Sequence, residues 1–227
     1  MKFPQGLLKG IISGIVLAGI LLTVRLSAEE TVLEKVEKDK SQEPPQVALT
    51  FDDGPHSVYT PILLDGLKER GIKATFFLMG KNIQGKEDIV KRMAEEGHLI
   101  GNHTYSHVQL SRLPMEKARE EVEKTNEEIY EITGEYPVYL RPPYGDWKKD
   151  MEKSLEMLPI FWDIDPLDWG RGDTAGIVSS IEGKIEDGSI ILLHDCYDSS
   201  VKAALQVADD LTKAGYELVT ADKLIVD

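Results

Sequence analysis

The stretch VALTFDDGP, residues 47–55, sets the fold: a short apolar segment runs directly into two adjacent carboxylates and a Gly-Pro turn. Val, Thr and Phe favour strands, whereas Gly and Pro end them. The side chains of Asp52 and Asp53 point in different directions because side chains alternate along a strand. The stretch therefore predicts a buried strand whose end presents two carboxylates, one free to bind a metal ion and the other to take up a proton. Taken alone, Asp-Gly-Pro is equally typical of a turn without chemistry.

Short apolar runs alternate with longer helical segments from this strand to the C-terminus. Six further strands are predicted at residues 74–79, 98–101, 137–140, 159–164, 189–193 and 216–219. Between them, apolar residues recur at helical spacing in 114–133 and 201–214. Seven strands alternating with helices predict one α/β domain, with a parallel sheet that is covered by helices on its outer side.

Polar side chains lie at or just past the ends of five of these strands. They are Asp52-Asp53, His103, Arg141, Asp165 and His194. The carboxyl ends of the strands of a (β/α) barrel converge on one rim, where catalytic residues are found. In an open doubly wound sheet, strands at opposite edges are too far apart to share a site. The distribution of polar residues therefore favours a barrel.

His103 and His107 are separated by four positions in the motif HTYSH. On a helical turn, this spacing puts two side chains on one face with Cβ atoms about 5–6 Å apart. Two imidazoles at that distance can chelate one ion, and a carboxylate would complete a three-ligand site with an open position for water or substrate. Asp52 and Asp53 are the candidates for that carboxylate.

The N-terminal segment differs in composition from the rest of the chain. Residues 1–28 contain three basic residues and no acid, and residues 11–24 are a largely apolar run of 14 residues without a charge. Counted from residue 7 to 24, past Lys9, the segment would form a helix of about 27 Å, close to the ~30 Å of a bilayer core. We expect 1–28 to be either a cleaved signal peptide or a membrane anchor, and the charged stretch 29–46 to be a linker.

Composition excludes several classes of function. The chain of 227 residues has 26 Lys and Arg against 40 Asp and Glu, a formal net charge of −14. Such an excess of carboxylates repels nucleic acid, so we expect no nucleic-acid partner. The single cysteine, Cys196, excludes intramolecular disulfides and a cysteine-based zinc site. Any metal must therefore be held by His, Asp or Glu.

Five motifs together resemble the polysaccharide deacetylases, also called carbohydrate esterase family 4 or the NodB homology domain. They are TFDDGP at 50–55, HTYSH at 103–107, RPPYG at 141–145, DPLDW at 165–169 and LLHD at 192–195. Their order and approximate spacing match the family, and the resemblance covers residues 47–227. It implies a distorted, incomplete (β/α) barrel of about seven parallel strands that removes N-acetyl groups from amino sugars.

The resemblance also implies roles for individual residues. The ligands of a divalent ion, most often Zn²⁺ with Co²⁺ or others as alternatives, would be Asp53, His103 and His107. The general base would be Asp52, oriented by Arg141, and the general acid would be His194, held by Asp168. The backbone N–H of Tyr144 would help to bind the oxyanion, and Trp169 and Leu192 would line the pocket for the acetyl methyl group.

These features predict an extracytoplasmic enzyme, anchored in the membrane through residues 7–24 or secreted into the cell wall. We expect a monomer that deacetylates an N-acetylglucosamine polymer, with peptidoglycan ahead of chitooligosaccharides and acetylxylan. A non-catalytic wall-binding module on the same fold is the main alternative. A glycosidase that uses Asp165 and Asp168 fits less well, because two carboxylates three positions apart in one loop cannot flank a sugar bond from opposite sides.

Overall fold

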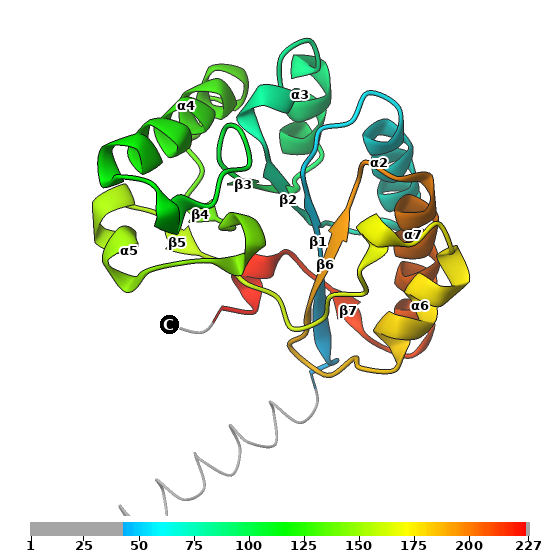
Figure 1. Cartoon of the computed structure of the whole chain (residues 1–227). Coiled ribbons are helices and arrows are strands. Elements are labelled where there is room, and N and C mark those ends of the chain that lie inside the picture. The colour runs from blue at the N-terminus through cyan, green and yellow to red at the C-terminus, as the bar shows by residue number, and fades with distance from the viewer. Residues whose placement is uncertain (1–42, 226–227) are drawn as a thin grey trace, which may run out of the picture. The chain divides into compact units, whose positions relative to one another are not determined.

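The computed structural model describes residues 43–225 (Figure 1). The predicted hydrophobic helix within residues 1–28 lies outside this range, as does most of the predicted linker. Gln46, the last residue of that linker, is already the first residue of the first strand. Between residues 43 and 225, no helix combines the length and the apolar content needed to cross a membrane.

The described part of the chain forms one sheet of seven strands, all paired in parallel. The strands are β1 (Gln46–Asp52), β2 (Thr75–Leu78), β3 (Leu99–Asn102), β4 (Tyr139–Leu140), β5 (Leu158–Pro159), β6 (Ile190–His194) and β7 (Glu217–Leu218). Their order is β5-β4-β3-β2-β1-β6, and β7 pairs with the start of β1. The predicted α/β fold with seven parallel strands is confirmed.

Helices surround the sheet, with α4 and α5 beside β4 and β5, and α6 and α7 beside β6 (Figure 1). The helices in residues 43–225 are α2 (Tyr59–Arg70), α3 (Glu87–Glu95), α4 (Met115–Thr133), α5 (Lys149–Leu155), α6 (Thr174–Glu182) and α7 (Asp198–Lys213). The predicted helix at 114–133 is confirmed within one residue, and α7 begins three residues before the predicted start at 201. Gly71 and Gly134 end α2 and α4 in the left-handed conformation that glycine adopts without strain.

The alternation of side chains along β1 connects the core to the site. Val47, Leu49 and Phe51 are completely buried in the main apolar cluster beneath the helices. Thr50 and Asp52, which alternate with these residues, are buried on the opposite face of the strand. One strand therefore packs the outer core with one set of side chains and carries polar groups toward the interior with the other.

The predicted strand at 159–164 was wrong in its extent. The segment pairs with β4 only at Leu158–Pro159, and Ile164 then forms a bridge with Ile191 of β6. Leu192 N–H donates to the carbonyl of Ile164, at 2.9 Å, on the far side of the sheet. The segment between residues 158 and 164 thus leaves one edge of the sheet and reaches the other edge, instead of continuing as one regular strand.

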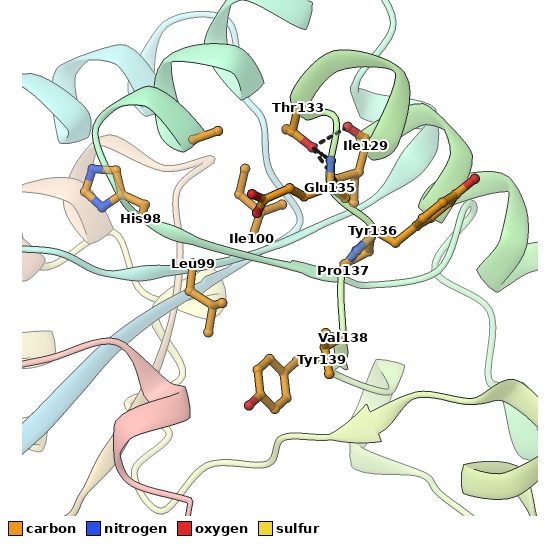
Figure 2. Close-up of a pocket in the computed structure, with 11 residues that line it drawn as sticks. His98, Leu99, Ile100, Ile129, Thr133, Glu135, Tyr136, Pro137, Val138 and Tyr139 are labelled. Carbon is orange, nitrogen blue, oxygen red and sulfur yellow. Dashed lines mark hydrogen bonds between the residues drawn. The ribbon is translucent and has the colours of Figure 1, made fainter.

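A cavity of about 200 Å³ lies at the amino ends of β3 and β4, next to the end of α4 (Figure 2). Leu99 and Tyr139, the first residues of the two strands, line it together with Ile129 of α4. The Thr133 hydroxyl donates to the carbonyl of Ile129 and accepts from the backbone N–H of Glu135. None of the site residues predicted from the sequence lines this cavity, because they follow the opposite ends of the strands.

Candidate functional site

Three predicted metal ligands meet at the carboxyl end of the sheet. Asp53 Oδ1 lies 3.6 Å from His103 Nε2 and 3.6 Å from His107 Nε2. One donor atom from each of the three residues lies within 4.8 Å of the other two. Asp53 Oδ1 is buried and has no hydrogen-bond partner among residues 43–225. A buried carboxylate oxygen without a partner is costly, so this geometry favours a cation between the three groups.

The HTYSH segment reaches this geometry without the helical turn that the spacing predicts. Both Thr104 and His107 have positive φ, at 62°, and the segment is an irregular, bent loop after β3. The Thr104 hydroxyl accepts from His107 N–H at 3.0 Å, and Asn102 Oδ1 accepts from Thr104 N–H at 2.7 Å. The predicted proximity of the two imidazoles is confirmed, with ring centroids 5.0 Å apart, but the predicted reason for it was wrong.

The position of His103 fixes which of its ring nitrogens faces the carboxylate. Its Nδ1 lies 2.7 Å from the backbone carbonyl of Arg141, which can only accept a hydrogen bond. Nδ1 must therefore carry the proton, which leaves the lone pair of Nε2 directed toward Asp53. Metal-binding histidines are commonly oriented in this way by a second hydrogen bond.

Asp52 forms a buried ion pair with Arg141. Arg141 is fully buried, Asp52 is 3% exposed, and the guanidinium donates to Asp52 Oδ1 at 2.9 Å. The same guanidinium donates to the Thr50 hydroxyl and to the backbone carbonyls of Ile160 and Phe161. Burial lowers the pKa of Arg141, and the charge of Asp52 opposes that shift. The pair leaves the second oxygen of Asp52 facing Asp53, His103 and His107, which we call the triad, and this oxygen lies 3.7 Å from His103 Nε2.

His194 completes the cluster from the end of β6. Its Nδ1 lies 2.8 Å from Asp168 Oδ1, and its backbone N–H donates to Asp168 Oδ2 at 2.8 Å. Nε2 lies 4.0 Å from Asp53 Oδ2. Burial alone would lower the pKa of His194, but the hydrogen bond and charge of Asp168, with the charges of Asp52 and Asp53, raise it to about 9. The geometry therefore favours a protonated imidazole at neutral pH.

A family model described as polysaccharide deacetylase matches residues 39–160, which is more than half of the chain. The chain belongs to the polysaccharide deacetylase family. The resemblance inferred from the five sequence motifs is thereby confirmed.

The family relatives include proteins named for two different substrates. The peptidoglycan-N-acetylmuramic acid deacetylase PdaC of Bacillus subtilis is 38% identical over 82% of this chain. The matched region spans only 40% of the length of that relative. The chitooligosaccharide deacetylase of a Bradyrhizobium species is 34% identical over 76% of this chain and 87% of its own.

Solved structures support the same fold. A structure of Bacillus subtilis PdaC has a TM-score of 0.78 at 38% identity, over 80% of this chain and 90% of that one. A family 4 acetyl xylan esterase from Clostridium thermocellum, solved with a cobalt ion, has a TM-score of 0.74 at 30% identity. It covers 79% of this chain and 89% of its own.

The three predicted pocket residues of this deacetylase-family chain differ in how closely they approach the triad. Tyr144 is 69% exposed, and its ring stands edge-on to His107 with centroids 4.8 Å apart. Leu192 is buried two positions before His194 on β6, so both side chains leave the same face of the strand. Trp169 is 58% exposed and follows Asp168 in a short 3₁₀ turn. Among residues 43–225, no side-chain hydrogen bond or aromatic ring contact links Trp169 to Asp53, His103 or His107.

Sequence reasoning assigned no role to two polar residues that support the site. Asp195 is completely buried, accepts from the Thr60 hydroxyl, and packs against Gly54, directly after Asp53. Burial raises the pKa of Asp195 to about 7. Thr50 accepts from Arg141 and donates to the Ile191 carbonyl. Period-two alternation offers a signal for Thr50, because it places this residue on the same face of β1 as Asp52.

Proposed function

We propose that the chain is a metal-dependent hydrolase that removes N-acetyl groups from an N-acetylglucosamine-containing polysaccharide. The observation that carries this proposal is that three sets of side chains with complementary chemistry lie next to one another. Asp53, His103 and His107 could hold a cation, Asp52 lies beside them in an ion pair with Arg141, and His194, bonded to Asp168, has its Nε2 4.0 Å from Asp53 Oδ2. Family membership supports the same reaction class.

The donor set fits a divalent ion of the zinc class. Two imidazole nitrogens and one carboxylate oxygen are a ligand set of open catalytic zinc sites. Across a tetrahedral ion with bonds of about 2.0–2.1 Å, two ligand atoms would be about 3.4 Å apart. The Asp53–His103 and Asp53–His107 separations of 3.6 Å are close to that value. A bound ion would polarise the acetyl carbonyl and lower the pKa of a water molecule beside it.

Asp52 is the proposed general base. The guanidinium of Arg141 holds one carboxylate oxygen and leaves the other directed toward the cation site. A fixed carboxylate in that place can accept a proton as water attacks the acetyl carbon.

His194 is the proposed general acid. The sugar nitrogen is a poor leaving group until it is protonated, and Asp168 holds His194 in its charged form. Nδ1 is engaged by Asp168, so Nε2 is the nitrogen that donates its proton toward the substrate. Because both Asp168 oxygens accept from His194, this carboxylate is not free to act on a glycosidic bond.

We further propose that Tyr144 contributes its backbone N–H to the developing oxyanion. Its edge-on contact with His107 brings the residue to the border of the cation site. Donors at that position stabilise a tetrahedral intermediate by about 3 kcal/mol each. Leu192 and Trp169 are the proposed walls for the acetyl methyl group.

Peptidoglycan is the proposed first substrate, because relatives named for it match most of this chain. Chitooligosaccharide and acetylxylan are the alternatives that the names of other relatives support. We propose that residues 1–28 direct export, as signal peptide or anchor, that 29–46 is a linker, and that 47–227 acts outside the cytoplasm. An apolar segment followed by a charged linker suits an insoluble substrate beyond the membrane.

Acetate release from the purified full chain tests this proposal. The protein is stripped with a chelator and supplied with peptidoglycan, chitin oligomers or acetylxylan, before and after zinc is restored. We expect acetate from at least one substrate, and only after zinc is added. Release of reducing ends would indicate a glycosidase, and the absence of both products on every substrate would favour a wall-binding module.

A further inference from the structure

The loop that carries His107 has a backbone conformation that local sequence does not favour. Thr104 and His107 both adopt positive φ, at 62°. Left-handed conformations are rare for residues other than glycine, and rarest for β-branched residues such as Thr. A conformation of this kind persists only where the surrounding structure holds it in place.

Helix α4 supplies that support from outside the metal site. Glu121 accepts from both the backbone N–H and the hydroxyl of Ser106, each at 2.8 Å. Ser106 immediately precedes His107 in the chain. A carboxylate that accepts two hydrogen bonds from one residue fixes both the backbone and the side chain of that residue.

The neighbouring residues of α4 hold the other parts of the same loop. The Val122 carbonyl accepts from Asn102 Nδ2 at 2.9 Å, and Asn102 Oδ1 in turn accepts from Thr104 N–H. Lys124 Nζ lies 3.4 Å from the ring centroid of Tyr105. Asn126 Oδ1 of α4 also accepts from Asn102 Nδ2, at 2.7 Å, next to His103. Glu121 is the α4 side chain bonded to Ser106, the residue next to His107, so its loss frees the part of the loop on which His107 depends.

We propose that Glu121 is a positioning residue that holds His107 in the geometry for binding a divalent cation. This inference rests on the proposed metal site, but not on the identity of the substrate. Removing the carboxylate leaves the Ser106 N–H without a charged acceptor and lets His107 relax toward ordinary φ values. Groups that orient metal ligands typically change metal affinity about 10–100-fold when they are lost.

The test compares Zn²⁺ binding by the full chain and by Glu121→Ala, measured in competition with a chromophoric chelator. Glu123→Ala is the matched control, because Glu123 lies on the exposed side of α4 and, among residues 43–225, forms no ion pair or side-chain hydrogen bond besides a distant contact with Arg119 at 3.8 Å. We expect Glu121→Ala to raise the Zn²⁺ Kd about 10-fold or more and Glu123→Ala to leave it unchanged. Glu121→Gln, which keeps one acceptor oxygen, is expected to lie in between.

A merely structural role for Glu121 would lower the Tm of the metal-free protein without changing the Zn²⁺ Kd, and this result would overturn the inference. The visible absorption of the Co²⁺-loaded protein is a second readout, which Glu121→Ala should change and Glu123→Ala should not. If Glu121→Ala does not fold, Ser106→Ala removes one of the two hydrogen bonds and should raise the Kd by a smaller factor. An unchanged Kd in Ser106→Ala would then contradict the proposal.

The outcome for the wild-type chain separates this inference from the proposed function. A wild-type chain that binds no Zn²⁺ would overturn the metal-dependent function itself. A wild-type chain that binds Zn²⁺, beside a Glu121→Ala variant that binds it equally well, would overturn only the role of Glu121.

Discussion

The pair formed by His194 and Asp168 gives a prediction for the pH dependence of stability. His194 is almost completely enclosed, its side chain being 12% exposed, and Asp168 accepts both its ring N–H and its backbone N–H. Asp168→Asn removes the negative charge but keeps a side chain of nearly the same size. The largest raising causes are then lost while burial remains, so the pKa of His194 in the variant should fall from about 9 toward its ordinary value of 6.5.

The size and sign of the effect follow from the pKa of His194. In the metal-free chain it is raised from 6.5 to about 9. Each pKa unit corresponds to about 1.4 kcal/mol, so the protonated pair contributes up to about 3 kcal/mol. Because the folded pKa is the higher one, this stability is present in full below pH 6.5 and is lost as the pH rises through 9. A cation bound to Asp53 would reduce the shift, so the measurement belongs to the metal-free protein.

Urea unfolding in the presence of a chelator, at pH 6.5 and pH 9.5, measures this contribution. The wild-type free energy of unfolding should fall between the two values by up to about 3 kcal/mol more than that of Asp168→Asn. The comparison at each pH cancels the titration of groups that the two proteins share. If Asp168→Asn loses as much stability as the wild type over this range, then Asp168 does not hold the charge of His194.

Three further predictions concern residues around the sheet. Arg141→Met should lower the free energy of unfolding by about 3–5 kcal/mol, because Asp52 would remain as a buried charge without a partner; urea denaturation showing a loss under about 1 kcal/mol would contradict this. Asp52→Asn should reduce acetate release at least about 100-fold while one zinc per chain is retained, and equal loss of zinc by elemental analysis would contradict the assignment of Asp52 as base. Burial lowers the pKa of His98 to about 4, so the wild-type free energy of unfolding should fall by up to about 3 kcal/mol as the pH falls from 6.5 to 4. Matched unfolding titrations of His98→Asn should lack this loss, and an equal loss in that variant would contradict the prediction.

The general architecture, and the meeting of polar residues at the strand ends, could be predicted from the sequence because two local rules determine them. Apolar runs of strand length separated by helical segments predict the parallel sheet, and polar residues at strand ends converge wherever parallel strands lie side by side. Those rules predict that a carboxylate of Asp52 or Asp53 approaches His103 and His107, whereas the choice of Asp53 came from the family resemblance. The structure brings the donor atoms of Asp53, His103 and His107 together.

Other features depend on tertiary contacts that spacing does not encode. The i, i+4 spacing of His103 and His107 fits a helical turn, but the loop instead takes a shape fixed by Asn102 and by Glu121 from a distant helix. The apolar segment 159–164 has the pattern of one strand. It leaves β4 after Pro159, and the carbonyls of Ile160 and Phe161 accept from the buried guanidinium of Arg141 instead of from a neighbouring strand.

Anomalous diffraction at the zinc absorption edge, from crystals of the zinc-loaded protein, shows directly whether Asp53, His103 and His107 bind one cation together. We expect one strong peak about 2.0–2.2 Å from a carboxylate oxygen of Asp53 and from Nε2 of both His103 and His107. A peak at any other place, or none between these three side chains at saturating zinc, would contradict it.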